Sequence, residues 1–166
     1  MNFLAKSQPL LLRQNKMSIH DLIIHKRDYD FAVNRFTRMA EHLIAISGRE
    51  IDIPEPVFDE QNRSISFEFT DTRVECRFSY NRGNTILTYG FIKIDEIDRK
   101  IFHETSRQFV NNTGEILVEK CGSGTGYKIN EDEGQNTFFF PRIFGALEDA
   151  WQYQDSEDPI PQADPD

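Results

Sequence analysis

The sequence lacks any apolar run long enough to cross a membrane. Runs such as Leu10–Leu12 and Leu22–Ile24 are far shorter than the roughly 20 residues that a spanning helix needs. The start of the chain also lacks a basic segment followed by an apolar stretch of about 7–15 residues, the pattern of a signal peptide. We therefore expect no membrane insertion and a protein that stays where it is made. Met17 is an alternative start.

Residues that bind metals are also few and scattered. The two cysteines are far apart and match no zinc or redox spacing, so we expect both to be reduced, small apolar residues. The histidines do not place two ligands on one helical turn beside an acid cluster. We therefore expect no metal and no cofactor. The residues considered are Cys76, Cys121, His20, His25, His42 and His103.

An excess of basic residues is absent as well. The net charge is -9 and the isoelectric point is about 4.9, so nucleic acid and anionic membranes are poor candidate partners. The charge is unevenly spread, because residues 1–27 are mainly basic and residues 152–166 carry acids without a base. Such acidity keeps a protein soluble while it shows apolar patches to a partner.

The sequence gives no positive sign of catalysis. Its one glycine-rich loop, 122–126, lies between two strand-like segments and is not followed by the Gly-Lys-Ser/Thr of a phosphate-binding loop. No Ser or Cys sits in a strand–elbow–helix context, and pairs of acids arise by chance among 28 acidic residues. We therefore expect no enzyme and name no catalytic residue.

Periodicity predicts one helix and three strands in the first half. The helix, over 29–47, begins at Asp28 or Asp30, ends at Gly48 and has one apolar stripe. After a loop with a short strand near Val57, strands with period-two alternation are expected at 65–69, 73–80 and 85–94. Hairpin turns join them, the second at Asn81–Asn84 with Gly83 free to adopt positive φ. The stripe contains Phe36, Met39, Ala40, Leu43 and Ile44.

The second half is predicted to hold two helices and two strands. A helix over 98–112 would align Ile101, Phe102, Thr105 and Phe109 on one face. Strands follow over 115–121 and 126–140, the latter broken at 131–135 and ended by Pro141. The last helix, over 142–153, would place one apolar side inward. That side comprises Ile143, Phe144, Leu147, Ala150 and Trp151.

These elements predict an α+β fold with the order helix, three strands, helix, two strands, helix, in which helices flank a twisted antiparallel sheet. Residues 28–153 form a single domain. Residues 1–27 form a partly flexible extension with a short helix or strand near 19–24, and residues 154–166 form a disordered acidic tail.

Aromatic residues are in excess, with 14 Phe in the chain. The run Phe138-Phe139-Phe140 is notable, because in a strand at least one of three consecutive side chains faces away from the other two. Either a helix covers that side chain, or it belongs to an apolar surface that binds a partner or a second copy.

Several segments resemble one protein family. Arg35–Ala40, Phe58–Arg63 and Thr88–Phe91 look like the first helix, the turn entering the sheet and the end of the third strand in the Tir-type chaperones of type III secretion effectors. The predicted order of elements resembles that family over about residues 30–153. Phe in place of much of its usual Leu and the basic extension are departures from the family pattern.

The resemblance implies a homodimeric chaperone of the bacterial cytoplasm that consumes no nucleotide. It would hold the N-terminal segment of a secreted effector in a non-globular form for delivery, and it leaves the secretion ATPase as a further candidate partner. The implied dimer contacts are Ile101, Phe102, Phe109 and Val118. The implied effector contacts are Phe36, Met39, Leu43, Phe67, Phe69, Phe138, Phe139 and Phe140.

Two alternatives stay open on sequence. An acidic immunity or anti-restriction inhibitor would bind a toxin or nuclease through clustered carboxylates. The acids here are spread along the chain and concentrate in its tail, which favours the chaperone. A small α+β enzyme is the second alternative, and no group of residues in the sequence supports it.

Overall fold

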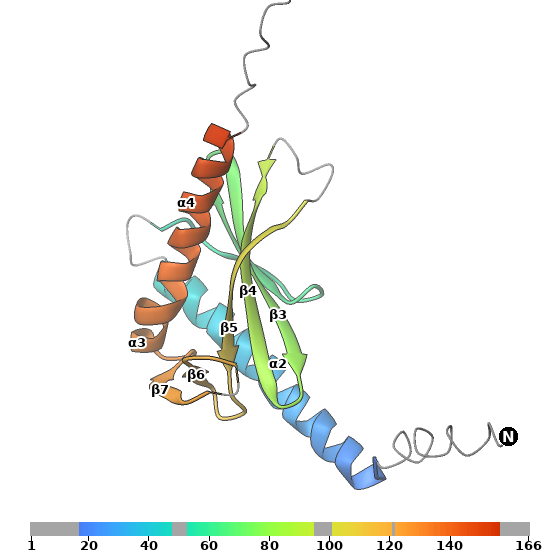
Figure 1. Ribbon diagram of the computed structural model, residues 1–166. Coiled ribbons are helices and arrows are strands. Elements are labelled where there is room, and N and C mark those ends of the chain that lie inside the picture. The colour runs from blue at the N-terminus through green and yellow to red at the C-terminus, as the bar shows by residue number, and fades with distance from the viewer. Residues whose placement is uncertain (1–16, 48–52, 95–100, 121, 157–166) are drawn as a thin grey trace, which may run out of the picture.

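The protein has an α+β fold with a long N-terminal helix, a curled antiparallel sheet and a long C-terminal helix (Figure 1). The computed structural model describes residues 17–47, 53–94, 101–120 and 122–156. Its elements are α2 (Ile19–Ser47), β1 (Val57–Asp59), β2 (Ser64–Phe69), β3 (Thr72–Asn81), β4 (Asn84–Lys93), β5 (His103–Val110), β6 (Glu115–Leu117), β7 (Gly124–Lys128), α3 (Asp132–Gly134), the π-helix η3 (Gln135–Phe139) and α4 (Phe140–Ser156).

The sheet has seven strands in chain order, each paired antiparallel with the next. The short strand β1 and the meander β2–β3–β4 confirm the strands predicted for the first half. The β3–β4 hairpin turns at Arg82 and Gly83, with φ angles of 47° and 89°. Positive φ at both central residues of a two-residue loop matches the right-handed twist of the strands, so the predicted turn is confirmed.

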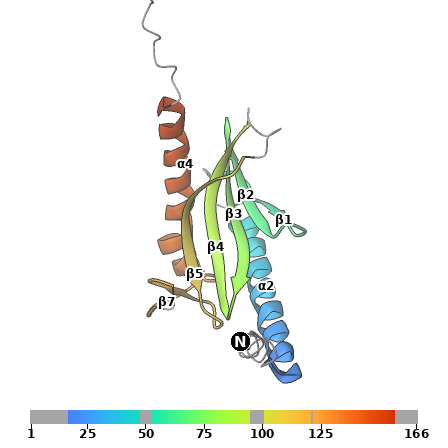
Figure 2. The same cartoon turned by 45° about the vertical axis from the view of Figure 1, so that its right-hand side comes forward.

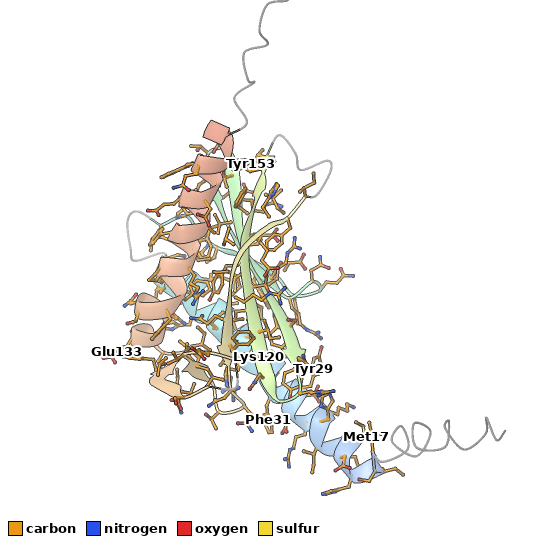
Figure 3. All side chains as sticks on the ribbon, viewed as in Figure 1. Met17, Tyr29, Phe31, Lys120, Glu133 and Tyr153 are labelled. Carbon is orange, nitrogen blue, oxygen red and sulfur yellow. The ribbon has the colours of Figure 1, made fainter. Side chains whose placement is uncertain are left out.

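Helix α2 begins ten residues before the predicted start, at Ile19, and therefore runs through the boundary predicted at residues 27 and 28. The N–H of Asp21 donates to Ser18 Oγ at 3.1 Å, and the N–H of Ser18 donates back to Asp21 Oδ2 at 3.1 Å. This reciprocal cap satisfies two donors at the start of the helix. The first turns of α2, between Met17 and Phe31, project beyond the sheet (Figure 3).

Both long helices pack on the same face of the sheet, because residues of both belong to one hydrophobic core with it. Phe36 of α2 contacts the ring of Phe78 on β3 at 5.2 Å, and Phe139 contacts the rings of Phe67 and Tyr89 at 6.2 and 5.8 Å. Cross-strand partners point to the same side, so these contacts fill one core. The opposite face of the sheet is covered by no described helix.

The helix predicted over 98–112 is wrong, since residues 103–110 form strand β5. Strand β5 pairs with β4 from Thr85↔Val110 to Phe91↔His103, and the register shifts between Tyr89 and Gly90. The order predicted for the fold is therefore corrected at its centre, where a strand replaces the helix. Residues 98–100 lie outside the described residues.

The long strand predicted over 126–140 is also wrong beyond residue 128. Strand β7 ends at Lys128, and Phe138–Phe140 are helical. The N–H of Phe140 donates to the carbonyl of Gln135, five residues back, which defines a π-helical turn. Pro141 follows at once, and its ring and missing N–H disfavour a regular turn there. The strand predicted over 115–121 ends at Leu117.

The chain ends agree only in part with the predicted domains. Helix α4 continues to Ser156, three residues past the predicted end of the last helix at residue 153. The predicted flexibility of residues 1–16 and the predicted disorder of residues 157–166 fall outside the described residues. Cys76 is buried in the core, as expected, and Cys121 falls outside the described residues.

Candidate binding surfaces

Most residues predicted to contact a partner lie in the hydrophobic core. None of Phe36, Met39, Leu43, Phe67 and Phe139 has more than 3% of its surface exposed. A partner would have to displace the core to reach them. Phe69 and Phe138 are half-buried at its border, where Phe138 contacts the ring of Tyr127 at 5.4 Å. Phe36 and Met39 line a small pocket of about 10 Å³, and Phe140, 8% exposed, lines a larger groove.

That groove lies between the end of α2 and the start of α4. It has a volume of about 410 Å³ and is lined by Ile46, Ile53, Phe140 and Phe144, with Asp132 and Asn136 at its rim. The Phe140 and Phe144 rings stack at 6.3 Å with an interplanar angle of 25°. A groove with an aromatic floor and a few polar groups at its rim is typical of sites that take apolar side chains. We call it the α2–α4 groove.

Helix α4 extends this apolar surface along its length. Phe144 is 44% exposed and Trp151 is 52% exposed, and seven residues, or two turns, separate them on the same side of the helix. The prediction that both face inward with Ile143 and Leu147 is wrong. Each follows a core residue by one position, which is about 100° around the helix. Counting that angle on the sequence would have shown a border position.

A contact between two polar side chains joins the elements beside the groove. His42 Nε2 of α2 contacts Asp132 Oδ1 of α3, close enough for a hydrogen bond. The pair joins the C-terminal half of α2 to the segment that leads into α4. It therefore keeps the two walls of the groove at a fixed separation. Because both side chains are partly exposed, the pair positions the walls and adds little to stability.

The uncovered face of the sheet carries matched charges. Arg77 Nε donates to Glu75 at 2.8 Å, and Arg73 donates to Glu68 at 2.7 Å. The Arg77 guanidinium lies 3.7 Å from the centre of the Phe102 ring. Arg73, Glu75 and Arg77 border a shallow polar hollow of about 470 Å³, which Asp59 and Asn62 also line. Both arginines at this hollow therefore already have a carboxylate partner.

The residues predicted for a dimer do not form one helical face. Phe102 precedes β5, and Phe109 points to the same uncovered face of the sheet as Phe102; both are half-buried. Ile101 is 40% exposed. Val118, 69% exposed, lies in the turn after β6. The structure therefore places Phe102 and Phe109 on one face of the sheet and leaves Val118 apart.

Gly90 determines where Phe102 lies. A Cβ atom at this position would come within 2.5 Å of Phe102 Cζ and 2.3 Å of the carbonyl oxygen of His103. Any side chain here would push β5 away from β4. Thr105, beside the register shift, donates its hydroxyl to the carbonyl of Tyr89 at 3.2 Å. The glycine and this bond together hold the irregular part of β5 against β4.

The described residues contain no group of three or more His, Cys, Asp or Glu placed to hold a metal ion. Burial raises the pKa of the Cys76 thiol far above its usual range, which keeps it protonated and a poor nucleophile. Tyr89 is buried beside it, its hydroxyl 2.8 Å from Gln108 Oε1. Cys76, Tyr89 and Gln108 are all buried.

Comparison with known protein families, with curated proteins and with solved structures finds no match. Among the described helices, none combines the length and apolar character needed to span a bilayer. The surfaces of the protein are therefore interpreted from their own geometry.

Proposed function

We propose that this protein is a non-enzymatic chaperone of the bacterial cytoplasm that binds a non-globular segment of a secreted effector. The observation that supports it best is the α2–α4 groove together with the exposed aromatic residues of α4. We call Phe144 and Trp151, two turns apart on one side of α4, the aromatic strip. Monomeric soluble proteins rarely expose a contiguous apolar surface unless it binds something. The first helix, the meander β2–β4 and the last helix agree with the order that the resemblance to effector chaperones implies, whereas strand β5 stands in place of its second helix.

The groove would take side chains rather than a folded domain. Its volume of about 410 Å³ fits a few large apolar side chains of an extended or helical segment. Each square ångström of apolar surface buried there contributes about 25 cal/mol, and ordering the segment offsets part of that gain. Asp132 and Asn136 at the rim would accept and donate hydrogen bonds to the segment's backbone. Binding of this kind needs no nucleotide.

Acidity suits the same role. A net charge of -9 keeps a protein with an exposed aromatic strip from self-association through nonspecific contacts. It also favours partner segments that carry basic residues between their apolar ones. Phe144 both lines the groove and belongs to the aromatic strip. We expect its side chain to contribute most to the binding energy, because aromatic side chains often dominate the binding energy of protein interfaces.

The test uses the single tryptophan as a reporter. The tagged full-length chain is incubated with an extract of the bacterial host, retained proteins are identified by mass spectrometry, and the N-terminal segment of each is titrated against the chain. Since Trp151 is the only tryptophan and is 52% exposed, a tryptophan-free segment that covers the strip should shift its emission to shorter wavelength.

Two variants locate the binding site. Phe144→Glu changes an exposed residue of the groove and should weaken segment binding by about 2 kcal/mol, which is about thirtyfold in Kd. Val57→Glu changes an equally apolar residue of β1 that is 59% exposed and should leave binding unchanged. Equal binding by Phe144→Glu and the natural chain would contradict the proposal. Retention of a toxin or nuclease through its catalytic domain would favour the inhibitor alternative.

A further inference from the structure

The polar hollow on the uncovered face of the sheet is built mainly from strands. Strands β1, β2, β3 and β4 all contribute to its lining, and Figure 2 shows β1 and β2 at the edge of the sheet away from α4. Strand pairing places Asp59, Ser64 and Arg77 side by side on three neighbouring strands. A site on paired strands is held more precisely than a site on loops. The volume of about 470 Å³ lies within the range of about 300–1,000 Å³ that is typical of small-molecule sites.

A buried acid forms part of this lining. Glu75 is 8% exposed and lies between Arg73 and Arg77 on β3. The three residues are two positions apart, so their side chains point to the same face of the sheet. Buried carboxylates in native proteins are hydrogen-bonded, and Arg77 Nε donates to Glu75 at 2.8 Å. A carboxylate can accept about four hydrogen bonds, so Glu75 keeps acceptor capacity for a donor in the hollow.

The side chain of Arg73 is only partly satisfied by the protein. Its Nη2 donates to Glu68 at 2.7 Å, but its Nε is buried and has no hydrogen-bond partner among the described residues. A buried donor without an acceptor is costly, and such a group in a native protein calls for an explanation such as a bound molecule. Because Arg73 lines the hollow, an acceptor bound there would draw its guanidinium into the open space.

Arg77 is held in one orientation before any ligand binds. Its Nε is bonded to Glu75, and its guanidinium lies 3.7 Å from the centre of the Phe102 ring. Phe102 is itself fixed beside Gly90, where a Cβ atom would come within 2.5 Å of the ring. The Arg77 side chain is still 42% exposed, and its fork has N–H donors beyond the one that Glu75 takes. A donor that is already ordered loses little entropy when a ligand binds.

The balance of charge decides which ligands the hollow can take. Two acids, Asp59 and Glu75, and two bases, Arg73 and Arg77, line it. An anion would lie against Glu75 and a cation would lie against the arginines, so neither gains much net attraction. A hydroxyl group both donates and accepts, so it can donate to Glu75 and accept from Arg77 without bringing in a charge. Hydrogen bonds to charged groups are also the stronger kind.

We propose that the polar hollow binds a neutral hexose, either free or at the end of a glycan chain. Neighbouring hydroxyls of the sugar donate to Glu75 and accept from Arg73 and Arg77. Its C–H groups lie against Ile92, an apolar residue of the lining, and Ser64 supplies a further uncharged donor and acceptor. The site lies on the face of the sheet opposite to the helices, so it is separate from the α2–α4 groove.

Saturation-transfer NMR with the full chain tests the proposal. The free probes are glucose, galactose and mannose, each with its 2-amino and uronate forms, which place a charge on the same ring. At least one neutral hexose should bind, with a Kd at least about tenfold lower than that of either charged form. A glycan array that presents these hexoses at chain ends separates the two sources, because a site that needs the chain binds the array and not the free sugar.

Two variants place binding in the hollow. Arg77→Lys keeps the charge but loses the planar fork that contacts Glu75 and a hydroxyl together, and it should weaken binding by at least about tenfold. Ser64→Leu fills part of the hollow from β2 without changing a core residue, and it should abolish binding. The control is Arg107→Lys, because Arg107 also donates to a glutamate on this face but does not line the hollow. Circular dichroism checks that each variant is folded.

The proposal is overturned if no neutral hexose binds, either free or in a chain, or if a charged form binds more tightly than its neutral parent. It is equally overturned if Arg77→Lys and Ser64→Leu both bind as the natural chain does, or if Arg107→Lys loses as much affinity as Arg77→Lys. These results are independent of the α2–α4 groove, and its variant Phe144→Glu should bind the hexose as the natural chain does.

Discussion

Phe139 and Phe144 test the division between core and groove, because they are the same residue type five positions apart. Phe139 is fully buried and contacts the rings of Phe67, Tyr89 and Phe140 at 5.5–6.2 Å. Phe144 contacts the Phe140 ring but is 44% exposed. The change to alanine removes the same atoms at both sites, so any difference in effect comes from the surroundings.

The burial of each phenylalanine determines how much its change to alanine should lower the free energy of unfolding. Phe139→Ala leaves a cavity in the core and should lower the free energy of unfolding by about 3–5 kcal/mol. That is a large part of the roughly 5–15 kcal/mol typical of a domain, and it corresponds to a fall in Tm of about 10 °C. Phe144→Ala loses a partly solvated contact and leaves no closed cavity, so it should cost about 1 kcal/mol.

Urea unfolding of both variants, followed by far-ultraviolet circular dichroism and Trp151 emission, measures the two free energies. The two variants should differ in the opposite sense in binding. At a temperature where both are folded, Phe144→Ala should bind an effector segment more weakly than the natural chain, and Phe139→Ala should lose less affinity. Equal losses of stability at the two positions would refute the division, because it requires Phe139 to lie in the core and Phe144 at its surface.

Two further predictions concern buried and capping polar groups. Gln135 is fully buried, and neither amide atom has a hydrogen-bond partner among the described residues, so Gln135→Met should raise the free energy of unfolding by about 1–3 kcal/mol in urea titrations; a loss would show that the amide is satisfied. Asp59 accepts hydrogen bonds from the N–H and side-chain amide of Asn62, which lower its pKa below the ordinary 3.8. Since the pKa is lower in the folded state, this stabilisation is present above pH 3.8 and is lost as the pH falls through the folded-state pKa. Asp59→Asn should therefore flatten the fall of Tm below about pH 4, whereas Glu60→Gln, which removes the same charge from an exposed neighbour, should not.

The helices and strands that were predicted correctly from the sequence are those whose apolar residues repeat at a regular spacing. The strands around Phe67, Cys76 and Leu87 alternate without interruption, and the second half of α2 repeats its apolar residues every three to four positions. The true start of α2 was missed although its signal was present. Ser18 and Asp21 form the Ser-x-x-Asp spacing of a reciprocal cap. The apolar residues after it, Ile19, Leu22 and Ile23, span little more than one turn and are exposed where the helix projects from the sheet.

The Phe138–Phe140 run was misassigned for a different reason. Three consecutive phenylalanines have no period, and β propensity favours a strand. Pro141 was interpreted as the end of that strand, whereas in the structure it follows a π-helical turn at the start of α4. The groove could not be predicted from sequence for the same reason. It depends on how far Phe140 and Phe144 lie from Ile46 and Ile53, residues about 90 positions away in the chain.

The error over β5 follows from the irregularity of this strand near Thr105. The helix was predicted from an apolar stripe that contained Phe102, Thr105 and Phe109, whose steps of three and four residues imitate the period of a helix. In the structure, Phe102 and Phe109 share one face of the sheet although they are seven positions apart, because Thr105 is an extra residue in the strand. The extra residue therefore hides the strand from periodicity. Deleting Thr105 should leave a regular strand that still pairs with β4, because Glu104 and Arg107 would then be two positions apart and would still point to the uncovered face.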